Sequence, residues 1–127
     1  MARVVIAEDD SLVAFALQCA LDAMGHKVVA AVDTGPAAVQ AVFRHRPDLV
    51  ITDGQLAQGT SGVVAAVQIS ELGFPVILTS ATVDAVTAID AGAEAFLQKP
   101  FSLNRIQQTI SDVLASSACR RRIPASA

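Results

Sequence analysis

Five short apolar runs recur along the chain and alternate with stretches in which apolar residues repeat at helical spacing. Runs of β-branched and other apolar residues predict buried strands, and they cover residues 3–7, 26–32, 49–53, 76–79 and 95–98. The intervening periodic stretches predict helices that begin near residues 11, 36, 62, 83 and 102. Five strands alternating with five helices predict an α/β fold: a five-stranded, parallel, doubly wound sheet covered on both faces.

Local signals set the expected ends of the helices. Ser11 and Ser102 can cap the first and last helices, while Gly25 and Gly73 can end the first and third. The segment around 83–90 is expected to be a short or irregular fourth helix. We expect one domain over residues 1–117 and a short tail over 118–127, because 127 residues suit a single core. The tail contains three successive arginines, 120–122, which are interpreted as solvated and without assigned function.

Composition argues against membrane, nucleic-acid-binding and disulfide-rich proteins. Hydrophobic residues make up 53% of the chain, yet no apolar run approaches the roughly 18 residues of a membrane helix, and no signal peptide is evident. A cytoplasmic location and no membrane partner are therefore predicted. A net charge of −3 argues against a nucleic-acid partner, which normally requires a basic surface. Cys19 and Cys119 are interpreted as reduced thiols, being too few and too far apart for a disulfide framework.

Acidic and polar residues stand at the ends of several predicted strands. Since the carboxyl ends of parallel strands meet at one edge of the sheet, we expect six residues to converge there: Glu8, Asp9, Asp10, Asp53, Ser80 and Lys99. Clustered carboxylates repel one another, and Mg²⁺ is the natural compensation because it binds carboxylates and leaves positions for phosphate oxygens. The pattern predicts a magnesium site in which Asp53 acts as a nucleophile toward phosphorus.

Each of these residues also has an ordinary structural interpretation. The acids at 8–10 suit the start of a helix, Ser80 suits a turn, and an isolated lysine is usually solvated. Thr79 is expected to be an ordinary strand residue. The ordered combination of an acid pair, a central acid, a hydroxyl and a lysine on successive strands favours the functional interpretation. Lys99 and the Ser80 hydroxyl could then neutralise and hydrogen-bond the added phosphoryl oxygens.

These motifs resemble the receiver domain of two-component response regulators, the CheY-like family, to about Ala115. The similar segments are the acidic run ending at Asp10, the strand ending in Asp53, the 75–81 segment with Ser80, and Lys99-Pro100-Phe101. The resemblance implies strand order 2-1-3-4-5 and a cis peptide before Pro100. It implies that Asp53 is the phosphoacceptor, that Ser80 and Phe96 are switch residues, and that Mg²⁺ is held by Glu8, Asp9, Asp53 and the backbone carbonyl of Gln55.

Three features depart from the family pattern. Leu56-Ala57 stands where methionine-proline is usual, and the loop that follows is one residue longer before Gly62. The interval from Ser80 to Lys99 is about three residues shorter than usual, which is why the fourth helix is expected to be truncated. Phe96 replaces the commoner tyrosine, which removes a hydroxyl but keeps a ring that can rotate inward.

The sequence therefore predicts a stand-alone receiver that takes a phosphoryl group from a histidine kinase or phosphotransfer protein and signals to an unknown protein target. It is expected to be a stoichiometric phosphoacceptor, not an enzyme, and a monomer or weak dimer. Two alternatives stay open: a degenerate receiver that binds a partner without phosphorylation, favoured by the altered loop over residues 56–61, and a small aspartyl-phosphate phosphatase. The two histidines, His26 and His45, are expected to lie outside the site.

Overall fold

The five apolar runs form the strands of one parallel sheet in the computed structural model, which describes residues 1–122. The strands are β1 (Arg3–Ala7), β2 (Lys27–Val32), β3 (Leu49–Asp53), β4 (Val76–Ser80) and β5 (Ala95–Gln98). All neighbours pair in parallel in the order β2-β1-β3-β4-β5. The predicted fold and strand order are confirmed. Every residue of β3 and β4 is buried, because these central strands are covered on both faces.

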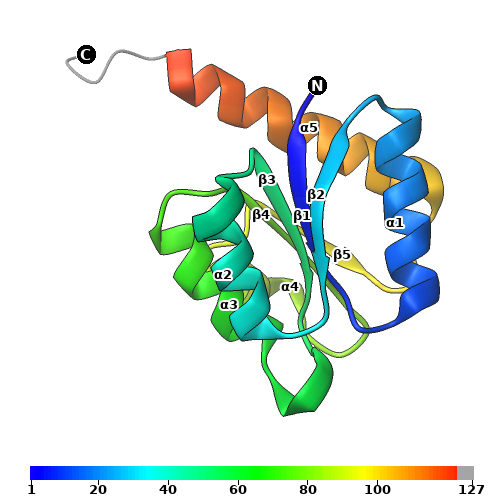
Figure 1. Ribbon diagram of the computed structural model, residues 1–127, viewed down its shortest axis with the longest axis vertical. Helices are drawn as coiled ribbons and strands as arrows, with labels where there is room; N and C mark the ends of the chain where they lie inside the picture. The colour runs from blue at the N-terminus through cyan, green and yellow to red at the C-terminus, as the bar shows by residue number, and fades with distance from the viewer. Residues whose placement is uncertain (123–127) are drawn as a thin grey trace.

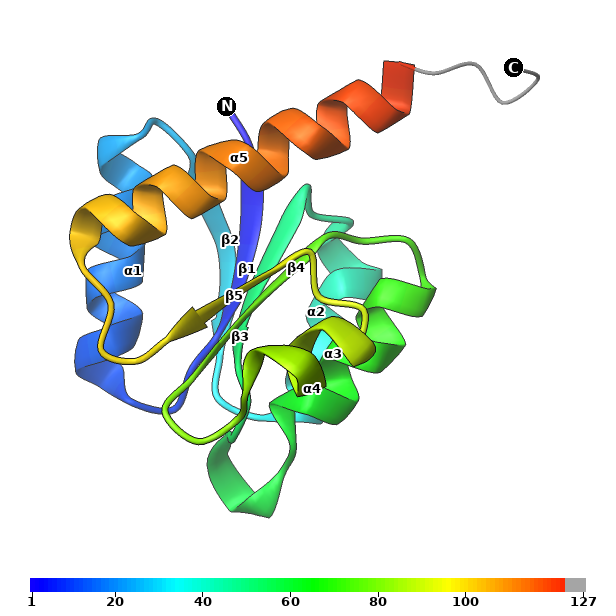
Figure 2. The same cartoon turned by 180° about the vertical axis from the view of Figure 1, so that it is seen from behind.

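Five helices connect and cover the strands: α1 (Ser11–Ala23), α2 (Gly35–His45), α3 (Gly62–Glu71), α4 (Ala85–Asp90) and α5 (Leu103–Arg122). Helices α1 and α5 lie on one face of the sheet, and α2, α3 and α4 lie on the other (Figures 1 and 2). Among the described residues, no helix is both long and apolar enough to cross a membrane.

Alternation along the strands divides the core into two clusters. On the α1/α5 face, Ile6, Ile51 and Ile77 pack with Leu17 of α1 and with α5. On the other face, strand residues such as Leu78 pack against α2, α3 and α4. Successive residues of a strand therefore point to opposite faces, which decides on which side each polar strand end lies.

The residues that cap and end α1 and α3 can be compared with those predicted. Asp10, not Ser11 as predicted, is the N-cap of α1: its Oδ1 accepts hydrogen bonds from the amides of Leu12 (2.9 Å) and Val13 (3.4 Å). Both residue types are good caps, and the chain enters the helix one residue earlier than predicted. Gly25 and Gly73 follow α1 and α3 at φ +80° and +92°, where glycine carries no Cβ penalty.

The last two helices differ greatly in length. Helix α4 has 6 residues, as the short interval between Ser80 and Lys99 predicted. Helix α5 has 20 residues and begins behind Ser102, whose Oγ accepts from the amide of Arg105 (3.1 Å). It reaches Arg122, so residues 118–122, predicted as part of a tail, are helical. The remaining five residues, 123–127, lie outside the described part of the chain.

The loop after Asp53 is more ordered than a polar linker. It contains a 3-10 turn (Ala57–Gly59), and Gln55 and Ser61 form an isolated antiparallel bridge. Leu56, at the position of the missing methionine, is buried. The amide of Ala57 donates to the carbonyl of Asp33 at 2.8 Å. The longer loop is therefore held against the turn that precedes α2.

Candidate functional site

The carboxyl edge of the sheet brings together the charged residues that the sequence singled out. Asp53 ends β3, Glu8 directly follows β1, and Lys99 directly follows β5. Strand alternation places all three side chains on the α1/α5 face, since each lies two residues beyond a residue of that cluster: Ile6, Ile51 and Leu97. Residues 91 positions apart in the chain are thereby placed in contact.

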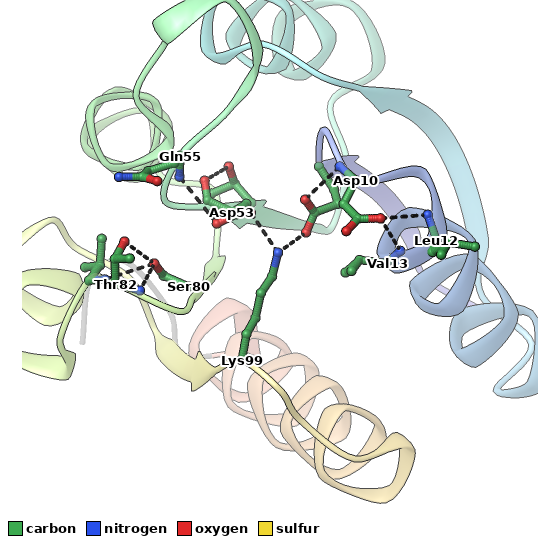
Figure 3. Close-up of polar contacts among 11 residues, drawn as sticks. Asp10, Leu12, Val13, Asp53, Gln55, Ser80, Thr82 and Lys99 are labelled. Atoms are coloured by element: carbon green, nitrogen blue, oxygen red, sulfur yellow. Dashed lines mark hydrogen bonds and ion pairs between the residues drawn. The ribbon is translucent and has the colours of Figure 1, made fainter.

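Lys99 is the centre of the contacts. Its Nζ lies 2.6 Å from Glu8 Oε1 and 2.7 Å from Asp53 Oδ2, so one ammonium bridges two carboxylates (Figure 3). The side chain of Glu8 is only 1% exposed and that of Asp53 only 11%. Burial strengthens these ion pairs, because water screens them little.

The protonation equilibria reflect this crowding. Burial raises the pKa of Glu8 above its ordinary value, and the negative charge of Asp53 adds to the effect, although hydrogen bonds from Lys99 and the Asp10 amide oppose it. Burial acts to lower the pKa of Lys99, but hydrogen bonds to Asp53 and Glu8 outweigh it and raise the pKa above its ordinary value. Lys99 is therefore charged at neutral pH, which the two carboxylates require.

A third carboxylate completes a cluster of possible metal ligands. Oxygen atoms of Glu8, Asp9 and Asp53 lie within 4.8 Å of one another, and Asp9 is exposed to solvent. This set could hold a hard divalent cation, because it offers only oxygen ligands and three negative charges against one ammonium. Asp10 points away to cap α1, as Figure 3 shows, so the two neighbouring aspartates have different roles.

Gln55 lies beside the cluster. Its amide donates to Asp53 Oδ1 at 3.3 Å, and this contact holds the second carboxylate oxygen of Asp53 (Figure 3). The proposed use of the Gln55 carbonyl as a metal ligand remains a prediction of the family resemblance. The ordered loop nevertheless brings the Gln55 backbone to the carboxylate despite its altered sequence.

The hydroxyl of Ser80 faces the loop that follows β4. Ser80 Oγ accepts from the amides of Thr82 (3.0 Å) and Val83 (2.9 Å), and it lies 3.4 Å from Thr82 Oγ1 (Figure 3). A Cβ on Gly54 would meet Ser80 Oγ at 3.3 Å, so the hydroxyl borders the residue after Asp53. Because Ser80 Oγ accepts these two amide bonds, its O–H stays available as a donor for the predicted contact with a phosphoryl group.

Phe96, the second predicted switch residue, lies on the face of α2, α3 and α4. It is partly buried and packs against the cluster that contains Leu78, its partner in β4, and Ala88 of α4. The ring thus packs against the core cluster to which the short helix α4 contributes Ala88. Its role remains a prediction.

Position 62 requires glycine because its backbone passes against the Asp53 carbonyl. A Cβ there would lie 1.5 Å from the carbonyl oxygen of Asp53, so the start of α3 passes directly against the end of β3. The Gly62 amide donates to the carbonyl of Gly54 at 3.0 Å. This close approach fixes the backbone that carries the central carboxylate.

Comparison with known proteins settles the family. Residues 4–111 match the response regulator receiver domain. The chain belongs to the response regulator receiver domain family. This receiver domain is 38% identical over 106 residues to the transcriptional regulatory protein PdtaR of Mycobacterium tuberculosis, a match that covers 80% of this chain and 51% of PdtaR. It is 35% identical over 107 residues to KdpE of the same species, covering 82% of this chain and 47% of KdpE.

Solved structures agree with the fold of the receiver domain. It resembles the receiver domain of the Erythrobacter litoralis PhyR response regulator, with a TM-score of 0.80, 31% identity and 90% of each chain covered. The receiver domain of a modulated diguanylate cyclase from Desulfovibrio desulfuricans gives a TM-score of 0.84 at 25% identity, covering 94% of this chain and 98% of the other. The chain spans about half the length of the curated relatives it matches.

Sequence reasoning anticipated the convergence of the site but missed some of its contacts. The bridge from Lys99 to Glu8 was not predicted, since strand order alone does not show how far a lysine side chain reaches. Thr79, predicted as an ordinary strand residue, carries a buried hydroxyl without a hydrogen-bond partner among the described residues. The signal that could have marked Thr79 is a polar residue near the carboxyl end of an otherwise apolar, buried strand.

Proposed function

We propose that this receiver domain takes a phosphoryl group from a histidine kinase or phosphotransfer protein onto Asp53 in a Mg²⁺-dependent reaction. One observation carries the proposal: the Asp53 carboxylate ends a central strand inside a cluster of oxygen ligands and touches the ammonium of Lys99 at 2.7 Å. A nucleophile, a cation to receive the new charge and ligands for a metal therefore stand in one place.

The transfer follows from these groups. One oxygen of Asp53 forms a bond to phosphorus while the bond from phosphorus to the donor's imidazole nitrogen breaks. The nitrogen keeps the electron pair and later takes a proton from solvent. The negative charge moves from the carboxylate to the phosphoryl oxygens, and Lys99 follows it because an ammonium binds the larger charge. Glu8, whose side chain is 1% exposed and bonded to the same ammonium, limits how far Lys99 can move.

Mg²⁺ fits the ligands that the chain offers. Glu8, Asp9 and Asp53 would hold it, with the Gln55 carbonyl as a further ligand from the family resemblance. When bound, it would neutralise charge on the phosphoryl oxygens. Lys99 alone supplies one positive charge against three carboxylates, and a divalent cation would balance the cluster.

We propose that the donor approaches over an apolar groove beside the site. The groove has a volume of about 390 Å³ and is lined by residues of α1 and of the segments after β4 and β5: Leu12, Val13, Ala16, Ala81, Lys99, Pro100 and Phe101. Leu12 and the neighbouring Phe15 are 79% and 67% exposed. Clustered exposed apolar side chains are typical of a protein contact surface, and here they adjoin the charged Lys99 of the site.

The domain would act as a stoichiometric acceptor and not as an enzyme with a separate substrate. Phosphorylation would draw Ser80 away from its bonds to the 82–83 amides, and Phe96 and α4 would respond as the switch. Helix α4 is suited to move because it has only 6 residues, of which Ala88 alone is buried. The output would be contact with a protein target.

The direct test is intact mass after incubation with acetyl phosphate, with and without Mg²⁺. We expect a single phosphoryl adduct that requires Mg²⁺ and is absent from Asp53→Ala. An adduct that persists in Asp53→Ala would refute the assignment. No adduct on the natural chain, together with no Mg²⁺ binding, would favour the receiver that works without phosphorylation.

Two neighbouring aspartates provide a matched control. Asp9→Asn should greatly weaken the Mg²⁺-dependent uptake, because it removes one carboxylate of the cluster. Asp10→Asn should leave uptake close to that of the natural chain, since asparagine also caps helices and the variant keeps the backbone amide of residue 10 that donates to Glu8 Oε2. Equal losses in both variants would argue against the metal site described here.

A further inference from the structure

Thr79 stands apart from the other buried polar residues of the sheet. It is 1% exposed, and its Oγ1 has no hydrogen-bond partner among the described residues. Leaving a buried hydroxyl unpaired is unfavourable, so such a group calls for a physical reason. The nearby buried hydroxyl of Thr52, by contrast, donates to the carbonyl of Asp53 at 3.0 Å.

The register of the sheet places Thr79 beside the reactive carboxylate. Thr79 pairs with Asp53 on one side and with Leu97 on the other, and paired residues of parallel strands project to the same face. Ile77, two residues earlier in β4, belongs to the α1/α5 cluster, so the Thr79 side chain lies on that face too. This is the face that carries Asp53 and Lys99.

Lys99 must pass over Thr79 to reach its partner. Strand β4 lies between β3, which carries Asp53, and β5, which Lys99 follows. The bond from Lys99 Nζ to Asp53 Oδ2 therefore spans β4, and Thr79 is the last residue of that strand facing the same side. The register thus places the buried Thr79 side chain beneath the span of the ion pair.

We propose that Thr79 is a positioning residue for Asp53, a role that rests on the proposed phosphorylation of that carboxylate. As phosphorus approaches, Lys99 follows the negative charge onto the phosphoryl oxygens and releases Asp53 Oδ2. The Thr79 hydroxyl then donates to this oxygen and holds the carboxylate in place. It acts in both directions. In dephosphorylation a water oxygen bonds to phosphorus as the bond from Asp53 to phosphorus breaks, and the electron pair returns to the carboxylate, to which the hydroxyl donates. The protons of the water leave with the inorganic phosphate.

The proposal explains why the hydroxyl is unpaired at rest. While Lys99 holds Oδ2 at 2.7 Å, the carboxylate is kept in a position where it accepts no hydrogen bond from the Thr79 hydroxyl. Threonine at this position then slightly destabilises the unphosphorylated protein and favours the transition state for transfer. Function and resting stability are thus predicted to respond in opposite directions to the loss of one oxygen atom.

The test compares Thr79→Val, which keeps the shape and removes the hydroxyl, with Thr79→Ser, which keeps the hydroxyl. Uptake from acetyl phosphate with Mg²⁺ and decay after donor removal are followed by intact mass. We expect both rates to fall roughly two- to ten-fold in Thr79→Val, the range of one neutral hydrogen bond, and Thr79→Ser to restore them. The unfolding midpoint of unphosphorylated Thr79→Val should equal or exceed that of the natural chain.

Three results would overturn the proposal while leaving the proposed function intact: unchanged rates in Thr79→Val, a Thr79→Ser variant as slow as Thr79→Val, or a lower midpoint in Thr79→Val, which would show that the hydroxyl is already bonded at rest. A natural chain that takes up no phosphoryl group and binds no Mg²⁺ would instead refute the proposed function, and this role with it.

Discussion

The two edges of the sheet differ in whether their polar groups are paired. At the amino edge, side chains satisfy the backbone: Asp48 Oδ2 accepts from the amide of Arg3 at 2.9 Å, and His26 Nδ1 accepts from the amide of Ala2 at 2.9 Å. Arg3 in turn donates to the carbonyl of His45 at 2.6 Å. At the carboxyl edge, three carboxylates lie together, only two of them bonded to the Lys99 ammonium, and a buried hydroxyl has no partner in the described chain.

Polar groups at the amino edge stabilise the fold, whereas the fold keeps the charged groups of the carboxyl edge together although they repel one another. Each polar contact of the amino edge pairs a donor with an acceptor, which is the usual state of a buried polar group. The carboxyl edge is left with excess negative charge, a condition that ordinary folding would avoid and that a cation or a phosphoryl group can use. Substitutions at the two edges should therefore affect stability and phosphorylation differently.

Among substitutions at the two edges, Lys99→Met is expected to change the free energy of unfolding most. It leaves the buried carboxylates of Glu8 and Asp53 facing each other, and should destabilise the fold by about 2–4 kcal/mol at neutral pH without Mg²⁺. Mg²⁺ should recover much of the loss, because the cluster keeps all its ligands. The measurement is urea unfolding with and without Mg²⁺.

The other lysine of the chain, Lys27, is exposed and gives a matched control. Lys27→Met should change the free energy of unfolding by no more than about 0.5 kcal/mol, whether Mg²⁺ is present or absent. If Lys99→Met were as mild as Lys27→Met, the Lys99 bridge would not hold the carboxylates as described.

An intermediate effect is expected from Asp48→Ala at the amino edge. The variant leaves the Arg3 amide without its acceptor and should lower stability by about 1–2 kcal/mol. Uptake from acetyl phosphate at a temperature where the variant is folded should not change. Asp48→Asn, which keeps an acceptor oxygen, should recover part of the stability. A slower uptake in Asp48→Ala would show that the two edges are not independent.

The smallest effect concerns His26. Burial lowers its pKa below the ordinary 6.5, and the positive chain terminus adds to this, while Asp48 opposes it. The unfolded chain then binds a proton that the folded chain resists, so His26 should make stability decline as pH falls through about 6.5. His26→Asn, which can still accept from Ala2, should reduce this decline between pH 7.5 and 5.5. Identical pH profiles would contradict the assignment.

Much of the fold could be predicted because the central strands are covered on both faces. A run such as Leu49–Asp53 is apolar nearly throughout, and its boundaries match the predicted ones. The end of α5 was harder to predict. Its apolar spacing fades after Leu114, and the helix continues to Arg122 because no glycine or proline interrupts it before Pro124.

The site could be predicted in outline because strand ends of a parallel sheet converge. The pattern indicated which residues meet, but not which atoms. Whether Lys99 reaches Glu8 as well as Asp53, or Ser80 turns toward its own loop, depends on rotamers that spacing does not determine. The unpaired hydroxyl of Thr79 required the register across three strands, which no single stretch of sequence contains.

The most direct measurement is the location of the phosphoryl group in the natural chain. After phosphorylation by acetyl phosphate with Mg²⁺, borohydride reduction converts an aspartyl phosphate to homoserine, and peptide mass spectrometry identifies the changed residue. A single change at Asp53 is expected. A change at Asp9 or Asp10 with Asp53 unmodified, or a phosphoryl group that resists reduction on Ser80, would contradict it.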